Sequence, residues 1–248
     1  MRPAVFLPFL ILWLAAIPAG SSGVQNPAPP GRESVVLLHG LGRSGRSLKK
    51  LASRLARQGY LVVNLEYPTL ERPIEYLAEM VLRPELERLQ GFSPAKIHFV
   101  THSMGGIVVR YYLQHHSLEN LGYVVMLSPP NQGSEIVDHM KSIPLIKRLL
   151  SPAARELGTD RESLPLKLGR PGFKLGVIAG KKSHNPLNSL LIEGPDDGTV
   201  SVESARIAGM DDFLILPYSH RSILKSDKVI DQVLHFLKHG SFKRKPGG

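Results

Sequence analysis

One serine has the surroundings of a reactive side chain. It lies in the string Thr101-His102-Ser103-Met104-Gly105-Gly106, after an apolar run at 97–100 and before an amphipathic stretch. A sharp strand-to-helix turn would push Ser103 out of a sheet, and such a turn needs small neighbours like the two glycines. The general pattern is G-x-S-x-G, and here Thr101 replaces the first glycine. Many isolated turns of this kind are helix caps, but the flanking pattern favours a nucleophile at Ser103.

The composition limits the chemistry that could accompany this serine. Cysteine is absent from the 248 residues, which excludes thiol nucleophiles, disulfides and thiolate-bound zinc. A serine hydroxyl is a poor nucleophile at neutral pH, so it needs a histidine base oriented by a carboxylate. The pairs Asp196-Asp197 and Asp211-Asp212 match no calcium-binding loop. We therefore expect no metal and no diffusible cofactor.

The elements that would position these side chains alternate along the chain from Ser34 onward. Short apolar runs predict strands at 35–38, 61–63, 97–100, 123–127, 175–179 and 213–216. Apolar residues at helical spacing predict helices near 48–56, 74–82, 105–115 and 223–237, and Pro84 should kink or interrupt the second. This alternation predicts one α/β domain over residues 34–240, with about six mostly parallel strands and helices on both faces.

Three segments carry a resemblance to a known family. His39-Gly40-Leu41-Gly42 resembles an oxyanion loop, the string around Ser103 resembles a nucleophile elbow, and residues 128–134 are similar to a P-x-x-G-S segment. Together, residues 34–238 resemble the α/β-hydrolase superfamily, specifically its compact bacterial lipase and esterase branch of triacylglycerol lipase-like serine hydrolases. That family often has histidine where Asn131 stands, so we assign Asn131 no catalytic role.

The resemblance implies a chain order of serine, acid and histidine. Among ten histidines, His220 is the expected base because it follows the last predicted strand, whereas His184 precedes any plausible acid. The acid should lie in Asp196-Asp197-Gly198-Thr199-Val200, where Gly198 permits a tight turn. We select Asp197, and Asp196 is the alternative.

Two backbone N–H groups should bind the oxyanion that forms during acyl transfer. The resemblance points to those of Leu41 and Met104, one from each motif. Residues expected to support the loop and the elbow are His39, Gly40, Gly42, His102, Gly105 and Gly106.

The region between residues 134 and 173 departs from the regular alternation. Two apolar clusters flank Pro144, one at 136–143 and the other at 145–150. One interpretation is a cap or lid that lines an acyl pocket or opens at lipid surfaces. The other is a core helix followed by a surface excursion.

The N-terminus has the features of a signal peptide over residues 1–23. Arg2 precedes an apolar run at 4–17, Pro18 ends it, and Ala19-Gly20-Ser21 offers a cleavage site. The run is shorter than the roughly 20 residues that span a bilayer. We expect export to the periplasm or the medium, with an uncleaved anchor as the alternative. Residues 24–33, rich in Pro, Gly and Asn, should form a flexible leader.

The chain carries a formal charge of +10, from 31 basic and 21 acidic residues. Aromatic residues make up only 6% and do not alternate with the basic ones, so we expect no nucleic-acid partner. The basic residues gather at 43–57 and in a tail at 241–248. They predict a solvated face that could contact an acidic membrane surface peripherally.

These features together predict an exported serine hydrolase. It would cleave a small-molecule or lipid carboxylic ester through an acyl-enzyme, with Ser103, Asp197 and His220 as its catalytic residues. The alternatives are a thioesterase, amidase or acyltransferase with the same residues, or a non-catalytic member of the fold that binds a lipid or a partner.

Overall fold

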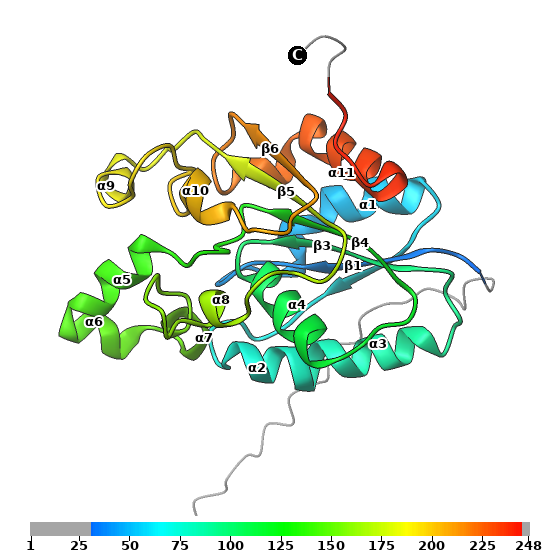
Figure 1. Ribbon diagram of the computed structural model, residues 1–248, viewed down its shortest axis with the longest axis horizontal. Helices are drawn as coiled ribbons and strands as arrows, with labels where there is room; N and C mark the ends of the chain where they lie inside the picture. Colours follow the sequence, from blue (N-terminus) through cyan, green and yellow to red (C-terminus); the bar gives the residue numbers. More distant parts are fainter. Residues whose placement is uncertain (1–30, 245–248) are drawn as a thin grey trace, which may run out of the picture.

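The protein is described here by a computed structural model that covers residues 31–244 (Figure 1). Six strands form one wholly parallel sheet in the order β2-β1-β3-β4-β5-β6. The strands are β1 (Ser34–Leu38), β2 (Leu61–Leu65), β3 (Ile97–His102), β4 (Leu121–Leu127), β5 (Leu175–Gly180) and β6 (Asp212–Leu216). The predicted fold class and all six predicted strands are confirmed.

Helices cover both faces of this sheet. The longer ones are α1 (Lys49–Arg57), α3 (Arg83–Gln90), α4 (Met104–His115), α5 (Glu135–Ser142), α6 (Pro144–Leu149) and α11 (Asp227–His239). The single-turn ones are α2 (Ile74–Leu77), α7 (Pro152–Arg155), α8 (Leu164–Lys167), α9 (Pro186–Ser189) and α10 (Val202–Ala205). Two 3₁₀ turns, η1 (Gly45–Leu48) and η3 (Ser222–Lys225), precede α1 and α11.

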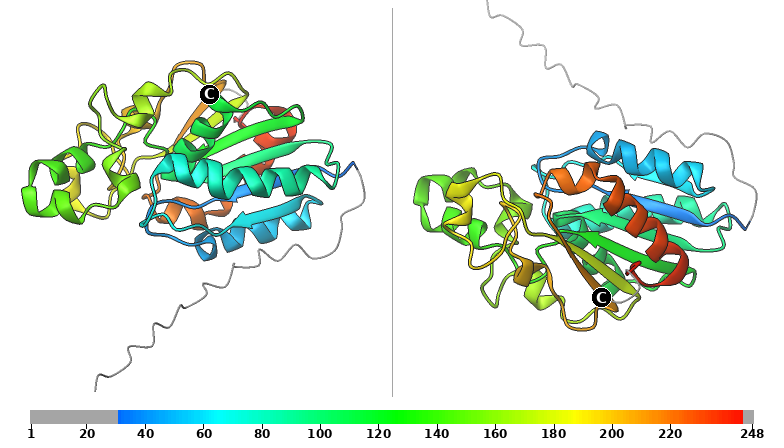
Figure 2. Two further views of the ribbon diagram at one scale, coloured as in Figure 1. Left: turned by 90° about the horizontal axis from the view of Figure 1, so that it is seen from below. Right: turned by 90° about the horizontal axis from the view of Figure 1, so that it is seen from above.

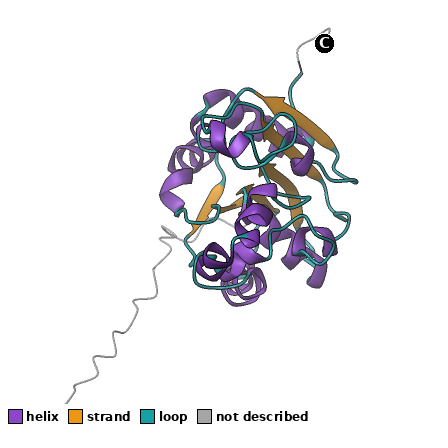
Figure 3. Ribbon diagram, turned by 90° about the vertical axis from the view of Figure 1, so that its left-hand side faces the viewer, coloured by secondary structure: helices purple, strands orange, loops and turns teal. Residues whose placement is uncertain are grey.

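The central strands are apolar throughout because both of their sides are buried. In β1, Val35 and Leu37 pack with α1 and α11 on one face, while Val36 and Leu38 pack with α2, α3 and α4 on the other. Seen from the left-hand side of Figure 1, the strands form a twisted layer with helices on either side (Figure 3). Since all six strands run the same way, their carboxyl ends meet at one edge.

The predicted disturbance at Pro84 takes the form of a π-helical turn. The segment η2 (Ala78–Leu82) joins α2 to α3, and Pro84 stands in the first turn of α3. Proline lacks an N–H and would clash with the carbonyl of a regular preceding turn, so widening that turn lets the helical path continue.

The segment from 134 to 173 forms α5 to α8, and α5 and α6 lie beyond the carboxyl ends of the strands (Figure 2). Ile136 and Val137 on α5 are buried, whereas α6 has no buried residue. Leu145 and Leu149 on α6 are 72% and 79% exposed. The first apolar cluster therefore packs inward, and the second faces outward.

The expected signal peptide at 1–23 and most of the expected leader lie outside the described residues. At the other end, packing continues past the boundary expected at residue 240, because Phe242 is buried against α11. Arg244 in the basic tail pairs with Asp212. None of the helices within residues 31–244 has the length and apolar character needed to cross a bilayer.

The basic segment at 43–57 is partly neutralised by α11. Lys50 pairs with Asp227, and Arg54 pairs with both Asp227 and Asp231. The sequence predicted a solvated basic face at this segment. The ion pairs could not be predicted, because the sequence does not show that α1 lies beside the aspartates in the first half of α11.

Candidate active site

Ser103 occupies the sharp turn that the sequence predicts between β3 and α4. Its backbone has φ 54° and ψ −129°, a conformation that side-chain-bearing residues rarely adopt. The turn is held in the sheet, since the Ser103 N–H donates to the Leu127 carbonyl at 2.9 Å. Thr101, the departure from the usual pattern, lies within β3, where β-branched residues are common, and its buried hydroxyl has no hydrogen-bond partner within residues 31–244.

The glycines of the motif permit close approach of backbones. A Cβ on Gly105 would lie 2.7 Å from the Leu38 carbonyl oxygen and 2.9 Å from that of His39. A Cβ on Gly106 would lie 3.0 Å from the Met126 sulfur. A Cβ on Gly40 would likewise lie 2.9 Å from the Ser103 Cβ. The loop after β1 and the turn after β3 can therefore meet only with glycine at these positions.

Asp197 and His220 meet beside this turn. The His220 Nδ1 donates to Asp197 Oδ2 at 2.8 Å, and the His220 backbone N–H donates to the Asp197 carbonyl at 2.9 Å. Asp197 Oδ1 accepts the N–H groups of Thr199 and Val200 at 3.0 and 2.9 Å. The carboxylate is 2% exposed and fully bonded, so it fixes the imidazole with Nε2 left to act as a base.

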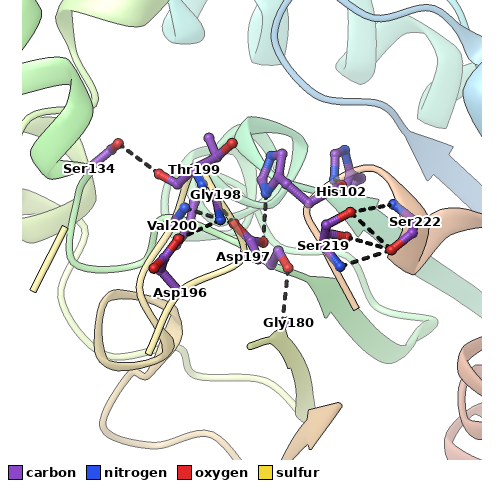
Figure 4. Close-up of polar contacts among 12 residues, drawn as sticks. His102, Ser134, Gly180, Asp196, Asp197, Gly198, Thr199, Val200, Ser219 and Ser222 are labelled. Carbon is purple, nitrogen blue, oxygen red and sulfur yellow. Dashed lines mark hydrogen bonds and ion pairs between the residues drawn. The ribbon is translucent and has the colours of Figure 1, made fainter. Parts of the chain in front are cut away.

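The structure brings Asp197, and not Asp196, to the imidazole. Figure 4 shows the two carboxylates pointing to different partners across the 196–200 turn. Asp196 Oδ1 accepts the Gly198 N–H at 2.6 Å and the Ser189 hydroxyl at 2.9 Å. Asp196 thus closes the turn and ties it to α9, while Asp197 reaches the base.

His102 holds His220 from the opposite side. Its Nε2 donates to the His220 carbonyl at 2.9 Å, and the two ring centroids lie 4.6 Å apart. Burial, and secondarily the charge of a protonated His220, lower the pKa of His102 well below its usual value. His102 is therefore a neutral side chain that positions the base.

His39 supports the loop after β1. Its ring is fully buried, stacks on Tyr67 at 4.2 Å, and contacts the Gly40 carbonyl through Nδ1 at 3.1 Å. The Tyr67 hydroxyl donates to the His39 carbonyl. Burial lowers the pKa of His39, although nearby Glu66 opposes this shift. The side chain is thus part of the loop's packing, as expected.

Ser103 and His220 face the same cavity of about 200 Å³. Its other walls are mostly apolar or backbone, and they include Leu41, Pro130, Val137, Leu157 and Val200. No hydrogen bond joins the Ser103 hydroxyl to His220 in the part of the chain described. The N–H groups of Leu41 and Met104 likewise have no hydrogen-bond acceptor within residues 31–244, so both are available to a ligand.

Several residues that position or line the site escaped the sequence analysis. Arg43 and Arg221 line the cavity, and Arg221 could have been noticed because it directly follows His220. Gly180, the last residue of β5, lies against the acid turn. A Cβ there would lie 2.8 Å from the Asp197 Cβ and would strike the Tyr218 carbonyl. No local pattern marks Gly180, because both contacts come from distant segments.

Arg110 on α4 bonds to residues on both sides of the helices α5, α6 and α7. Its guanidinium donates to Asn131 Oδ1 at 3.2 Å and to the carbonyls of Pro165 and Gly169, both at 2.8 Å. The side chain is 3% exposed, and burial lowers its pKa to about 10. Asn131 also donates to the Ala205 carbonyl, so this position has a structural task.

His184 does not take part in the pair but lies close to it. It lines a neighbouring cavity of about 350 Å³ together with Asp197 and His220. The remaining histidines lie away from the cavity, on β3, α4 and its end, α5 and α11, namely His98, His115, His116, His139, His235 and His239.

The sheet order, the strained serine and the buried acid–histidine pair define an α/β hydrolase. The profile of the alpha/beta hydrolase family matches residues 35–216, and the chain belongs to that family. Lysosomal thioesterase PPT2 of Mus musculus is 26% identical over 244 residues, covering 84% of this chain and 76% of that protein. The Homo sapiens protein of the same name is 27% identical with the same coverage.

Solved structures of bacterial enzymes share the fold. The mature lipase BlEst2 of Bacillus licheniformis superposes with a TM-score of 0.67 at 21% identity, covering 87% of this chain and 95% of that one. Phospholipase PlaB from Legionella pneumophila has a TM-score of 0.65 at 17% identity, covering 85% and 60%. The chain thus belongs to a hydrolase family, and the proteins similar to it include a lipase, a phospholipase and thioesterases.

Proposed function

We propose that the protein is a serine hydrolase that cleaves carboxylic esters through an acyl-enzyme. The observation that carries this proposal is the Asp197–His220 pair beside the strained Ser103, all at one edge of the sheet. Ser103 attacks the ester carbonyl while His220 Nε2 takes the hydroxyl proton. The proton then passes to the leaving alcohol, and water repeats the sequence to release the acid.

Asp197 has an orienting role in this scheme. It holds the Nδ1–H tautomer and stabilises the imidazolium that forms when His220 takes the proton. The direct Ser103–His220 hydrogen bond would form with substrate present, since catalytic hydrogen bonds are often long in free enzymes.

The developing oxyanion would bind the two unpaired N–H groups of Leu41 and Met104. Met104 is the first residue of α4, so the positive end of the helix dipole adds to its N–H. Removing one such donor costs about a hundredfold or more in other enzymes. Since both donors belong to the backbone, side-chain substitutions would test them poorly.

The experiment is hydrolysis of p-nitrophenyl esters of increasing acyl length, combined with labelling by a fluorophosphonate probe. We expect turnover with short acyl chains to exceed turnover with long ones, because the cavity is below the usual 300–1,000 Å³ range of ligand pockets. Ser103→Ala should lose turnover by about 10⁶-fold and lose labelling. Ser53→Ala, on the exposed side of α1, is the control. Turnover retained in Ser103→Ala would refute the assignment.

A thioesterase is the second candidate, and the PPT2 relatives favour it. The same residues would attack a thioester, and the better thiolate leaving group reduces the need for protonation by His220. Comparing kcat/KM for butyryl esters and butyryl thioesters separates the two candidates. Release of free acid in water, without transfer to an added alcohol or amine, separates both from an acyltransferase. Failure of the probe to label folded protein would favour a non-catalytic binding role.

We also propose export and contact with acidic lipid surfaces. The exposed Leu145 and Leu149 of α6 stand on either side of Lys147 and Arg148. Leu187 on α9 and Leu190 next to it are also exposed. Apolar and basic residues in this arrangement suit an anionic membrane interface. Fractionation of cells that express the full chain, and sedimentation with anionic vesicles, would test these two points separately.

A further inference from the structure

Two arginines line the cavity that holds Ser103 and His220. Arg43 follows the loop that carries the Leu41 N–H, and Arg221 directly follows His220. Arg43 is half-buried and Arg221 is exposed. Each charge is thus tied to a segment of the proposed catalytic machinery, within reach of a ligand in the cavity.

Neither guanidinium is neutralised by a hydrogen bond or an ion pair within residues 31–244. The carboxylates near these segments have other partners. Glu66 accepts the Gly45 N–H at 2.8 Å, Asp197 accepts His220, and Asp227 pairs with Lys50 and Arg54. The cavity therefore carries an excess of positive charge.

The two charges also act on one another. Burial, and then the charge of Arg221, lower the pKa of Arg43. Holding two like charges together in a partly desolvated place is unfavourable unless an anion joins them. Guanidinium groups suit phosphate and carboxylate, because their planar forks donate two parallel hydrogen bonds to either anion.

The arginines and most of the apolar residues come from different parts of the molecule. Arg43 and Arg221 precede α1 and η3, which are joined by the hydrogen bond from Lys50 Nζ to the Lys225 carbonyl at 2.9 Å. Apart from Leu41, which stands two residues before Arg43, most of the apolar wall comes from other segments, through Pro130, Val137 and Leu157. An acyl chain against the apolar wall would leave the alcohol portion of the ester toward the arginines.

We infer that Arg43 and Arg221 bind an anionic group, phosphate or carboxylate, on the alcohol side of the ester substrate. This inference rests on the proposed ester hydrolysis and adds its substrate class. The scissile ester would lie at Ser103, and the anion would lie a few bonds away on the leaving alcohol. The arginines would then be specificity-determining residues.

The test compares pairs of substrates that share one acyl group. One pair is 1-butyrylglycerol 3-phosphate and 1-butyrylglycerol, and the other is 3-butyryloxypropanoate and its methyl ester. These short esters dissolve as single molecules, so surface charge does not affect the comparison. Butyrate release gives kcat/KM for each. We expect the anionic member of at least one pair to be preferred about tenfold or more, as hydrogen bonds to charged groups imply. The pair with the larger preference identifies phosphate or carboxylate.

The variants are Arg43→Gln, Arg221→Gln and Arg221→Glu, with Arg46→Gln as the matched control. Arg46 is exposed in η1, three residues after Arg43, and does not line the cavity. We expect each glutamine variant to lower the anionic-to-neutral ratio about tenfold, and Arg221→Glu to invert it. Arg46→Gln should leave the ratio unchanged, and raised salt should lower it in the wild-type protein. Thermal melting checks that each variant folds.

The outcomes separate this inference from the proposed function. Equal kcat/KM for both members of each pair, or an unchanged ratio in all three variants, would overturn the anion site while ester hydrolysis stands. Absence of turnover with all four esters and with p-nitrophenyl butyrate would overturn the proposed function, and the anion site with it.

Discussion

The nucleophile turn and the helices α5 and α6 are built differently, although α5 lines the same cavity as Ser103. At the turn, Gly105 lies so close to the Leu38 carbonyl that no side chain fits, and every residue of β3 is buried. By contrast, α6 has no buried residue, and α5 buries residues on only one of its sides. The difference indicates that backbone packing fixes the position of Ser103, whereas α6 is held without burying any of its residues.

The largest effect should come from replacing Asp197, which holds His220 beside the Ser103 turn. Asp197→Asn removes the carboxylate that holds the Nδ1–H tautomer, so kcat should fall by about 10⁴-fold. Asp196→Asn is the matched control, because that carboxylate bonds only within its turn and to α9. Ester hydrolysis by both purified variants is the measurement. A greater loss with Asp196→Asn would reverse the assignment of the acid.

A smaller effect should follow from adding one methyl group to the turn. Gly105→Ala would force its Cβ against two backbone carbonyls, which cannot move without shifting β1. Overpacking of this kind costs about 1–3 kcal/mol, measurable by urea unfolding. A shift of Ser103 by about 1 Å would lower kcat/KM by about a hundredfold. Gly172→Ala, which meets no atom within 4 Å, should change neither quantity. Equal effects of the two changes would contradict the rigid-turn interpretation.

The pH dependence of stability should come from three buried histidines on and next to the central strands. Burial lowers the pKa of His39, His98 and His102 below 6.5 in the folded protein. The unfolded chain therefore binds more protons below pH 6.5, and the free energy of unfolding should fall as pH drops from 7 to 5. Above pH 7 these histidines are neutral in the folded and the unfolded protein, so they no longer lower the free energy of unfolding.

Urea unfolding at pH 7, 6 and 5 checks this expectation. His102→Gln should flatten the slope in part, because one of the three buried imidazoles is removed. Leu149→Ser on α6 should leave the slope as it is. Identical slopes in His102→Gln and the wild-type protein would show that His102 does not contribute.

The smallest effects on stability are expected from replacing the exposed leucines of α6. Replacing Leu145 and Leu149 with serine should change the free energy of unfolding by less than about 0.5 kcal/mol, since both are exposed. Val137→Ser, at a buried position of α5, should cost at least about 1 kcal/mol. The double serine variant should also bind anionic vesicles less well in sedimentation. Undiminished vesicle binding would place the lipid contact elsewhere.

The strands and the Ser103 turn could be predicted from the sequence, because each is marked by a pattern of neighbouring residues. Buried parallel strands appear as unbroken apolar runs, and the Ser103 turn displays its glycines within four residues. The pairing of Asp197 with His220 was predicted from the chain order that the family resemblance implies. The sequence analysis selected Asp197 and kept Asp196 as the alternative, because a sequence does not show which of two neighbouring side chains points to the imidazole.

The rest depends on contacts between distant segments. Gly180 and Arg43 act on residues far away in sequence, and no spacing rule marks them. Helices α5 and α6 are both short and both contain apolar residues, but the leucines of α6 are exposed. Hydrophobic periodicity could therefore not distinguish a helix packed on the core from one that faces solvent. The π-helical turn before Pro84 is a local adjustment that the sequence indicated only as a disturbance.

The Arg110 guanidinium gives the segment from Asn131 to Gly169 a common fastening at both ends. Loss of this side chain would leave the carbonyls of Pro165 and Gly169 without this partner, while Asn131 would keep its bond to the Ala205 carbonyl. The helix that begins beside Ser103 therefore also bonds to the segment that supplies Val137 and Leu157 to the cavity wall. A single buried cation thus joins the serine-bearing turn to part of the wall opposite it.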